Sequence, residues 1–219
     1  EIGNDVYMQY KKTENGYVPL ENKNVDTGFG LDRMLAFLNG VTDGYKTDLF
    51  SGAIACLEGL SGKKYDDGGE AQKAMRIIAD HTRTTVMLIG DVNGILPSNT
   101  GAGYILRRLM RRAIRYCRAL GVAGSAMQDV AKVFIDEVYG EAYPLLPEKR
   151  EYILEEIARE TERFEATLEK GTKEFEKTLS GIERKNEFMS KQNPGYVKET
   201  KIGGKAAFKL YDTYGFPLE

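Results

Sequence analysis

The sequence predicts an α+β protein, in which a short antiparallel β segment precedes a mostly helical domain. Residues 6–12 alternate like a strand, and the stretch TENGY that follows contains an Asn-Gly pair, which is typical of a hairpin turn. From residue 31 onward, apolar residues recur at helical spacing instead. We therefore expect a β-containing part over residues 1–40 and a helical domain over residues 41–219.

The elements follow from these two periods. A second strand includes Val25, and Leu31, Met34, Leu35 and Leu38 define a helix that ends at Gly40. Further helices are predicted over residues 46–60, 70–89, 102–120, 126–139 and 146–185. The last carries an apolar stripe that should pack on a bundle, at Ile153, Ile157, Phe164, Leu168, Phe175, Leu179 and Ile182.

The C-terminal part of the sequence changes character. Residues 186–204 combine Pro194 with several glycines and polar residues, which predicts a loop. A short helix near residues 205–213 should end at Gly215 as its C-cap, with Pro217 just beyond.

The overall composition gives no sign of a special partner. Hydrophobic residues make up 42% and charged residues 29%, and the formal net charge is −2. The charge is unevenly placed, however, because every charged side chain between Asp91 and Asp129 is an arginine. No apolar run approaches the ~20 residues of a membrane span, and there is no signal peptide, so we expect a cytoplasmic protein without a membrane partner.

The cysteines and the chain ends support two further expectations. Cys56 and Cys117 are far apart, form no metal-spaced cluster and suit a reducing compartment. The chain starts at Glu1 without an initiator Met and stops at Glu219 just after a turn, so we expect a fragment of a longer protein. The single histidine, His81, lies on a mostly buried helix and is expected to be structural.

The stretch LPSNTGAGYILRRLMRR, residues 96–112, opens an amphipathic helix with a cationic side. At about 100° per residue, one side is apolar and the other collects arginines, at positions 107, 108, 111, 112, 115 and 118. Such a stripe suits the phosphates of a nucleic acid, with binding that weakens as salt rises. The alternative is that these arginines pair with acids on a neighbouring helix, such as those within residues 148–187.

Two polar residues near glycines are candidate recognition groups. Gly101 and Gly103 allow close backbone approach, and Asn99 offers both donors and acceptors; the alternative is a plain N-cap from Asn99 or Thr100. Asp212, in FKLYDTYGFP, lies in a last helical turn, where the helix dipole disfavours an acid by roughly 0.3–1 kcal/mol. Its alternative is a surface acid paired with Lys209 or an arginine.

The stretch VDTGFGLDRM, residues 25–34, is a strand-to-helix junction with candidate ligand groups. Asp-Thr-Gly is typical of aspartic proteases, but here an amphipathic helix follows at once. A dinucleotide-binding fingerprint fails because Arg33 occupies the place of the third glycine. What remains is Asp26 for an ammonium group, Gly28 and Gly30 leaving room for a ligand, and Arg33 for a phosphate.

Several blocks together resemble the alanyl-tRNA synthetase family of class II aminoacyl-tRNA synthetases. EIGNDVYMQY and VDTGFGLDRM resemble the end of the catalytic core, the latter being motif 3. IIADHTRTTVMLIGD, LPSNTGAGYILRRLMRRAIRY and KLYDTYGFP resemble the tRNA-recognition domain. The resemblance implies that residues 1–40 end a class II core and that residues 41–219 form a helical tRNA-recognition domain.

The resemblance also implies an activity. The family makes alanyl-adenylate from alanine and ATP with Mg²⁺, and then transfers the alanyl group to tRNA(Ala). By the same resemblance, Asp26 holds the α-amino group of alanine, Gly28 lines the alanine pocket, Arg33 binds the γ-phosphate and Gly30 permits its approach. Asp26 and Arg33 are therefore the catalytic candidates of this chain.

For tRNA, the resemblance implies that Asn99 and Asp212 recognise a G·U wobble pair in the acceptor stem. The RNA minor groove is wide and shallow, and the wobble leaves the guanine 2-amino group free for an amide oxygen or a carboxylate. The backbone of the stem would be held by the arginine stripe, at Arg107, Arg108, Arg111, Arg112 and Arg115. No DNA partner is expected.

Some family features are changed or missing. Asp32 stands where the family usually has Glu, and Ala102 where many members have Arg. Nothing matches motifs 1 and 2 or the zinc-bearing editing domain, so we expect no metal site in this chain and no adenylate formation by it alone. Pyrophosphate exchange by the isolated chain would contradict the latter. Two other readings remain open, a non-enzymatic RNA-binding module and a helical protein-interaction scaffold.

Overall fold

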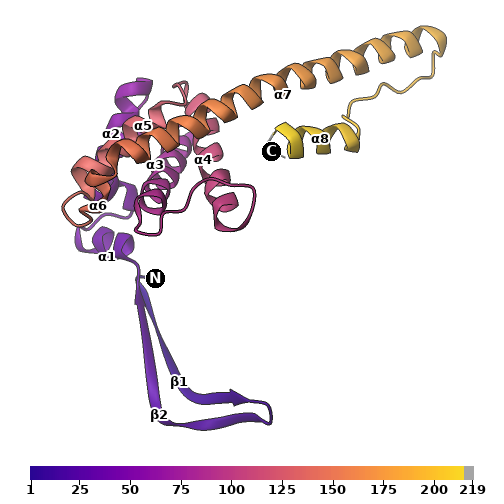
Figure 1. The fold of residues 1–219 in the computed structure, drawn as a ribbon. Coiled ribbons are helices and arrows are strands. Elements are labelled where there is room, and N and C mark those ends of the chain that lie inside the picture. The colour runs from indigo at the N-terminus through magenta and orange to yellow at the C-terminus, as the bar shows by residue number, and fades with distance from the viewer. Residues whose placement is uncertain (215–219) are drawn as a thin grey trace.

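A computed structural model describes residues 1–214, apart from the side chain of Asp212. A long hairpin at the N-terminus leads into a helical body, from which one long helix projects (Figure 1). This order of elements confirms the α+β class. The predicted C-cap at Gly215 and the following Pro217 lie outside the described residues.

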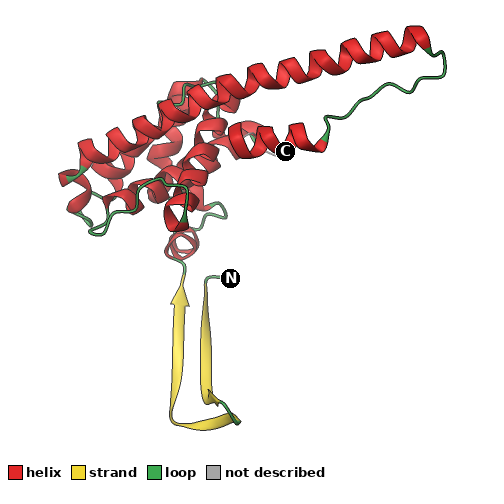
Figure 2. Cartoon of the chain, turned by 45° about the vertical axis from the view of Figure 1, so that its right-hand side comes forward, coloured by secondary structure: helices red, strands yellow, loops and turns green. Residues whose placement is uncertain are grey.

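The hairpin consists of β1 (Gly3–Thr13) and β2 (Gly16–Phe29), which pair antiparallel. The predicted hairpin is thus confirmed, although its turn is not the I′ type favoured by Asn-Gly. In the described part of the chain only glycines have positive φ, including Gly16 at +116°, whereas a I′ turn needs positive φ at both central residues. The register shifts between Met8 and Tyr10, and the hairpin bends near its tip (Figure 2).

The helices of the body begin with α1 (Leu31–Leu38), which ends before Gly40 as predicted. The next four confirm the predicted helical segments and are α2 (Asp48–Ser61), α3 (Gly69–Gly90), α4 (Gly101–Leu120) and α5 (Ala126–Val133). A π-helical turn over Phe134–Val138 continues α5.

The predicted single helix over residues 146–185 is wrong at both ends. The structure has a short α6 (Leu145–Glu148), a break at Lys149, and a 43-residue α7 (Arg150–Gln192). At the break, the Lys149 ammonium donates to the backbone oxygen of Asp91 at 2.6 Å. After α7, the chain returns as α8 (Gly204–Tyr214).

Residues 186–192 were expected to be loop, but they belong to α7. The side chain of Asn186 stabilises the helix end by bonding both backbone groups of Glu199 on the returning segment, each at 2.8 Å. The Tyr196 hydroxyl also donates to Asn186, at 3.0 Å. These contacts come from tertiary structure, so the polar composition of the segment could not reveal them.

The core lies between α2, α3, α4, α5 and the first half of α7. On α7, Ile153, Ile157 and Phe164 are fully buried, as the predicted stripe requires. Further along, Leu179 is 37% exposed, because this half of the helix projects from the body (Figure 1). The helices within residues 1–214 contain no apolar stretch of the length that spanning a bilayer requires.

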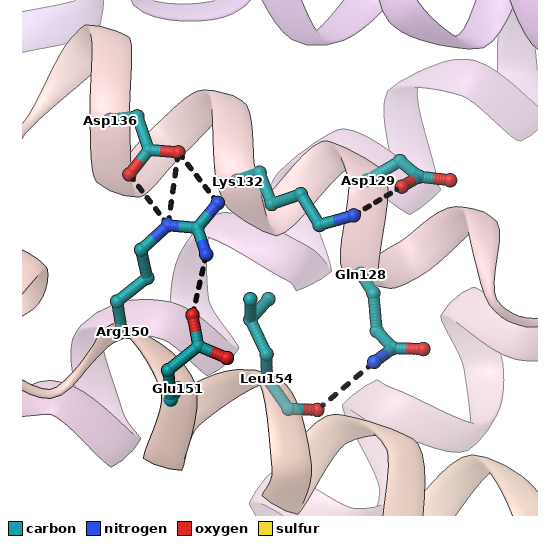
Figure 3. A network of polar contacts seen from close by, with 7 residues as sticks. All are labelled: Gln128, Asp129, Lys132, Asp136, Arg150, Glu151 and Leu154. Atoms are coloured by element: carbon teal, nitrogen blue, oxygen red, sulfur yellow. Dashed lines mark hydrogen bonds and ion pairs between the residues drawn. The ribbon is translucent and has the colours of Figure 1, made fainter.

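Polar contacts fix the start of α7 on the α5 segment (Figure 3). The Arg150 guanidinium donates to both carboxylate oxygens of Asp136, Nε to Oδ1 at 3.0 Å and Nη2 to Oδ2 at 3.0 Å. Gln128 Nε2 donates to the backbone oxygen of Leu154 at 3.3 Å. These bonds help to set the path of α7 across the body, where Glu160 reaches α4.

Candidate functional site

The end of β2 offers an open face with a carboxylate. Asp26 and Gly28 are two residues apart in β2 and therefore point to the same face of the hairpin. Across the strand pair they lie opposite Val6 and Asn4, and both are exposed. A Cβ atom built on Gly28 would meet no heavy atom within 4 Å. This face therefore has room for a small ligand beside the Asp26 carboxylate.

Gly30 and Arg33 come together at the junction of β2 and α1. A Cβ atom on Gly30 would lie 3.3 Å from Cδ of Arg33, so the glycine leaves space for the arginine side chain. Arg33 is exposed, and its Nη1 donates to the backbone oxygen of Glu1 at 3.3 Å. A hydrogen bond from Asn4 and the charge of Arg33 lower the pKa of the Glu1 carboxyl.

The α1 helix is held on the helical body by Asp32, one of the two residues noted above as departing from the resembled pattern. Arg83 of α3 donates to both carboxylate oxygens of Asp32, at 2.9 and 3.0 Å. Its Cζ lies 4.3 Å from the ring centroid of Phe50. Burial opposes the charged form of Arg83, but hydrogen bonds to Asp32 and Tyr139 raise its pKa overall. No pattern in the sequence predicted that Arg83 would pair with Asp32.

The loop before α4 is closed over the start of the helix. Ser98 N donates to the Gly103 oxygen at 3.0 Å, and Ser98 Oγ donates to the Thr100 oxygen at 2.8 Å. A Cβ atom on Gly103 would lie 2.4 Å from both the Leu96 oxygen and Ser98 Oγ. Glycine is therefore required at position 103 for the loop to pack this closely.

Asn99 lies exposed on this loop and does not cap the helix. The N-cap residue is Thr100, as the alternative allowed, but its side chain makes no cap bond, and Asn99 is not the cap. Instead, Asn99 Oδ1 accepts a hydrogen bond from Nη1 of Arg107. Because a guanidinium has only donors, the amide oxygen of Asn99 must face Arg107. The amide nitrogen is then the end of the side chain that turns away from α4.

The arginines of α4 do not all share one open surface, which corrects the prediction of a wholly cationic face. Arg107 and Arg111 turn toward α7, where Glu160 is only 2% exposed. Arg111 Nε donates to Glu160 Oε1 at 2.7 Å. Arg107 Nε lies 3.4 Å from the same oxygen but forms no hydrogen bond, so this contact is an ion pair only. The alternative of pairing with acids on a neighbouring helix is thus confirmed for these two arginines.

Two other arginines lie on the solvent-exposed surface of α4. Arg108 and Arg112 are exposed, and they lie 5.7 and 5.9 Å from the ring centroids of Tyr104 and Tyr116. Arg115 is half-buried. Exposed guanidiniums one helical turn apart, each beside a tyrosine, can bind phosphate oxygens or stack on bases.

Asp212 lies on α8, but its side chain is outside the described residues. Both ribbon views show α8 running back toward the helical body (Figures 1 and 2). Lys209 holds α8 against α7, because its Nζ lies 2.9 Å from Oε1 of Glu174.

Glu160 is the main residue that sequence reasoning missed. Its position in the sequence could have indicated its role, because Glu160 falls on the predicted apolar stripe of Ile153, Ile157 and Phe164 at helical spacing. An acid on a core-facing stripe indicates a buried cationic partner.

His81 is buried on α3, with Nδ1 3.1 Å from Asp80 Oδ2. The described residues include no group of three or more His, Cys, Asp or Glu side chains that could hold a metal.

Several alanine–tRNA ligases are similar to this chain over its whole length. An alanine–tRNA ligase of Borreliella afzelii is 41% identical over 220 residues, which cover 100% of this chain and 34% of that protein. Alanine–tRNA ligases of Treponema pallidum and Anaeromyxobacter dehalogenans are each 42% identical over the whole chain, which covers 34% and 24% of them. The chain thus spans about a third of the length of the Borreliella and Treponema proteins and about a quarter of the Anaeromyxobacter protein. The family model of tRNA synthetases class II (A) matches residues 1–219, and the chain therefore belongs to this family.

Proposed function

We propose that this chain is part of an alanine–tRNA ligase. In this proposal residues 1–40 contribute to binding alanine and ATP, and residues 41–219 recognise the acceptor stem of tRNA(Ala). The names of the relatives support the overall activity. The observation that carries the RNA part is an exposed pair of arginines, Arg108 and Arg112, on the helix that follows the closed loop bearing Asn99.

The open face of the hairpin suits a small amino acid. The Asp26 carboxylate would bind the α-ammonium group of alanine, and the open space beside Gly28 would accept its methyl side chain. Arg33 would bind the γ-phosphate of ATP, with Gly30 leaving room for the arginine. The carboxylate of alanine would attack the α-phosphate of ATP, which forms alanyl-adenylate and releases pyrophosphate.

On the RNA side, Arg108 and Arg112 would contact the phosphate backbone of the acceptor stem. Such contacts set the position of the protein without specifying the sequence. Asn99 and Asp212 would recognise the G·U wobble pair from the wide, shallow minor groove. Phosphate contacts should affect all stems equally, whereas loss of Asn99 or Asp212 should affect only the discrimination between stems.

Binding of the chain to two acceptor-stem hairpins, with G·U or G·C at the wobble position, tests this division. Asn99→Ala and Asp212→Ala should erase the preference for G·U and keep the salt slope. Arg108→Ala and Arg112→Ala should weaken both hairpins equally and reduce the slope of log K against log salt by about 0.7–0.9 each. Arg118→Ala is the control, because Arg118 is exposed on the same helix but lies 3.9 Å from Glu165.

The outcomes separate the proposal from its competitors. RNA binding without any preference at the wobble position would favour a general RNA-binding module. No binding at low salt would favour a protein-interaction scaffold, in which the arginines of α4 serve internal ion pairs such as those with Glu160.

A further inference from the structure

We infer that Arg107 is a positioning residue that fixes the amide of Asn99 for recognition of the acceptor stem. The inference rests on the proposed function and adds a residue that acts through Asn99 instead of binding RNA itself. Its basis is a chain of contacts from α7 through α4 to the loop, formed by Glu160, Arg107 and Asn99.

The first link is the placement of Arg107. Its side chain is only 17% exposed, which is unlike an arginine that binds phosphate at a surface. Glu160 on α7 provides the compensating charge, with its Oε1 3.4 Å from Arg107 Nε. Arg111 holds the same carboxylate through a hydrogen bond of 2.7 Å. The Glu160 carboxylate is therefore fixed, and its charge holds the Arg107 guanidinium next to the loop before α4.

The second link joins Arg107 to the loop at two points. Nη1 donates to Asn99 Oδ1, and Nη2 donates to the backbone oxygen of Pro97 at 3.3 Å. One planar guanidinium thus holds both the backbone and the side chain of the loop. Lysine has a single ammonium centre and cannot reproduce this fork.

The consequence concerns which end of the Asn99 amide faces outward. An asparagine amide can present either its oxygen or its nitrogen, and the two orientations would bind different groups of a base pair. Contact with a donor-only guanidinium allows one orientation, with the oxygen toward Arg107 and the amide nitrogen outward. The outward nitrogen can only donate, so Asn99 would bind an acceptor of the wobble pair such as the uracil O2, and the free guanine 2-amino group would be bound by the Asp212 carboxylate. An exposed side chain that is already fixed loses less conformational entropy on binding, which favours discrimination.

The test is a double-mutant cycle on the G·U to G·C affinity ratio. If Arg107 acts through Asn99, then Arg107→Ala should lower the ratio by the same factor as Asn99→Ala, within about twofold. The double variant should show no further loss. Arg107→Lys should lose the preference as Arg107→Ala does, while it keeps the salt slope. Arg108→Ala is the control and should leave the ratio unchanged.

A second measurement does not depend on RNA. In an NMR spectrum, the side-chain amide of Asn99, identified by its absence from Asn99→Ala, should be rigid in the wild type. In Arg107→Lys it should become as mobile as the side chain of the exposed Asn93, while the thermal unfolding midpoint confirms that the variant is folded.

The two measurements distinguish the possible failures. If the wild type prefers G·U and Asn99→Ala erases this preference, but the Arg107 variants keep it, the inference is overturned and the proposed function stands. If the wild type shows no preference, the proposed function fails, and a rigid Asn99 amide that loosens in Arg107→Lys still supports the positioning. If the Asn99 amide stays rigid in Arg107→Lys, the inference that Arg107 positions Asn99 is overturned.

Discussion

Asp32 and Arg83 form a two-point ion pair that joins α1 to α3 across 51 positions of the sequence, with distances of 2.9 and 3.0 Å. Asp32 directly precedes Arg33, the candidate phosphate ligand, and Arg83 lies on a core helix of the body. The pair therefore fixes the helix that carries the proposed ATP contact relative to the proposed tRNA-recognition domain.

The Asp32–Arg83 pair should contribute measurably to stability. We expect a coupling energy of about 1 kcal/mol between Asp32→Ala and Arg83→Met, since the geometry is bidentate but Asp32 is 41% exposed to water. Urea unfolding of the two single variants and the double variant measures this coupling. Asp32→Glu restores the usual family residue and should retain part of it. Fully additive effects would show that the pair is only a surface contact.

Glu160 should be critical for stability as the shared partner of two half-buried arginines. Glu160→Ala leaves Arg107 and Arg111 without their compensating charge, and we expect it to lower the free energy of unfolding by about 3 kcal/mol. Glu162→Ala, on an exposed position of the same helix, is the control and should cost less than about 0.5 kcal/mol. Equal effects in denaturant titrations would refute this role for Glu160.

Two glycine-to-alanine substitutions within helices should have opposite effects. At Gly103 the new Cβ would lie 2.4 Å from the Leu96 oxygen, so the loop must move and stability should fall by about 1–3 kcal/mol. At Gly59 on α2 the new Cβ meets nothing within 4 Å, so Gly59→Ala should stabilise the helix by about 0.5–1 kcal/mol. Thermal and urea unfolding compare the two, and a neutral Gly103→Ala would disprove the close packing of the loop.

Asp43 should make stability depend on pH in the acid range. Burial works to raise the pKa of its carboxyl, but hydrogen bonds from Tyr65, the backbone of Tyr45 and Arg76 outweigh it and lower the pKa. The ordinary value is about 3.9, so the contribution of the charged form is fully present above this pH and is lost as pH falls through the lowered value.

Asp43→Asn should therefore cost about 2 kcal/mol at pH 7, and its difference from the wild type should shrink as pH falls below about 4. Urea unfolding over a pH series measures this difference. Asp67→Asn, at an exposed position, is the matched control and should cost less than about 0.5 kcal/mol at neutral pH. A difference between Asp43→Asn and the wild type that stays constant through the acid range would contradict the lowered pKa.

The two thiols should react at very different rates. Burial raises the pKa of Cys56, which is half-buried, and raises that of the fully buried Cys117 to about 12. Because the thiolate is the reactive form, an alkylating reagent at pH 8 should modify Cys56 first and Cys117 only on unfolding. Mass spectrometry of the timed reaction identifies the site, and rapid modification of Cys117 in the folded protein would contradict its burial.

The sequence by itself determined the local elements of this protein. Period-two alternation with a turn sequence defined the hairpin, and helical spacing defined α1 to α5, because both signals depend only on residues a few positions apart. The sequence also predicted close backbone approach at Gly101 and Gly103, and at Gly103 the structure shows this approach within the chain's own loop, where Ser98 N donates to the Gly103 oxygen.

Only the tertiary structure decided which of the α4 arginines face water. Every arginine of α4 has the same chemistry, but α7 crosses the helix so that Glu160, 49 positions after Arg111, neutralises two of them. Tertiary packing likewise joined Asp32 to Arg83 and extended α7 to Gln192. Such long-range pairs depend on the path of each helix through the core, and that path is set by the packing of all buried side chains together.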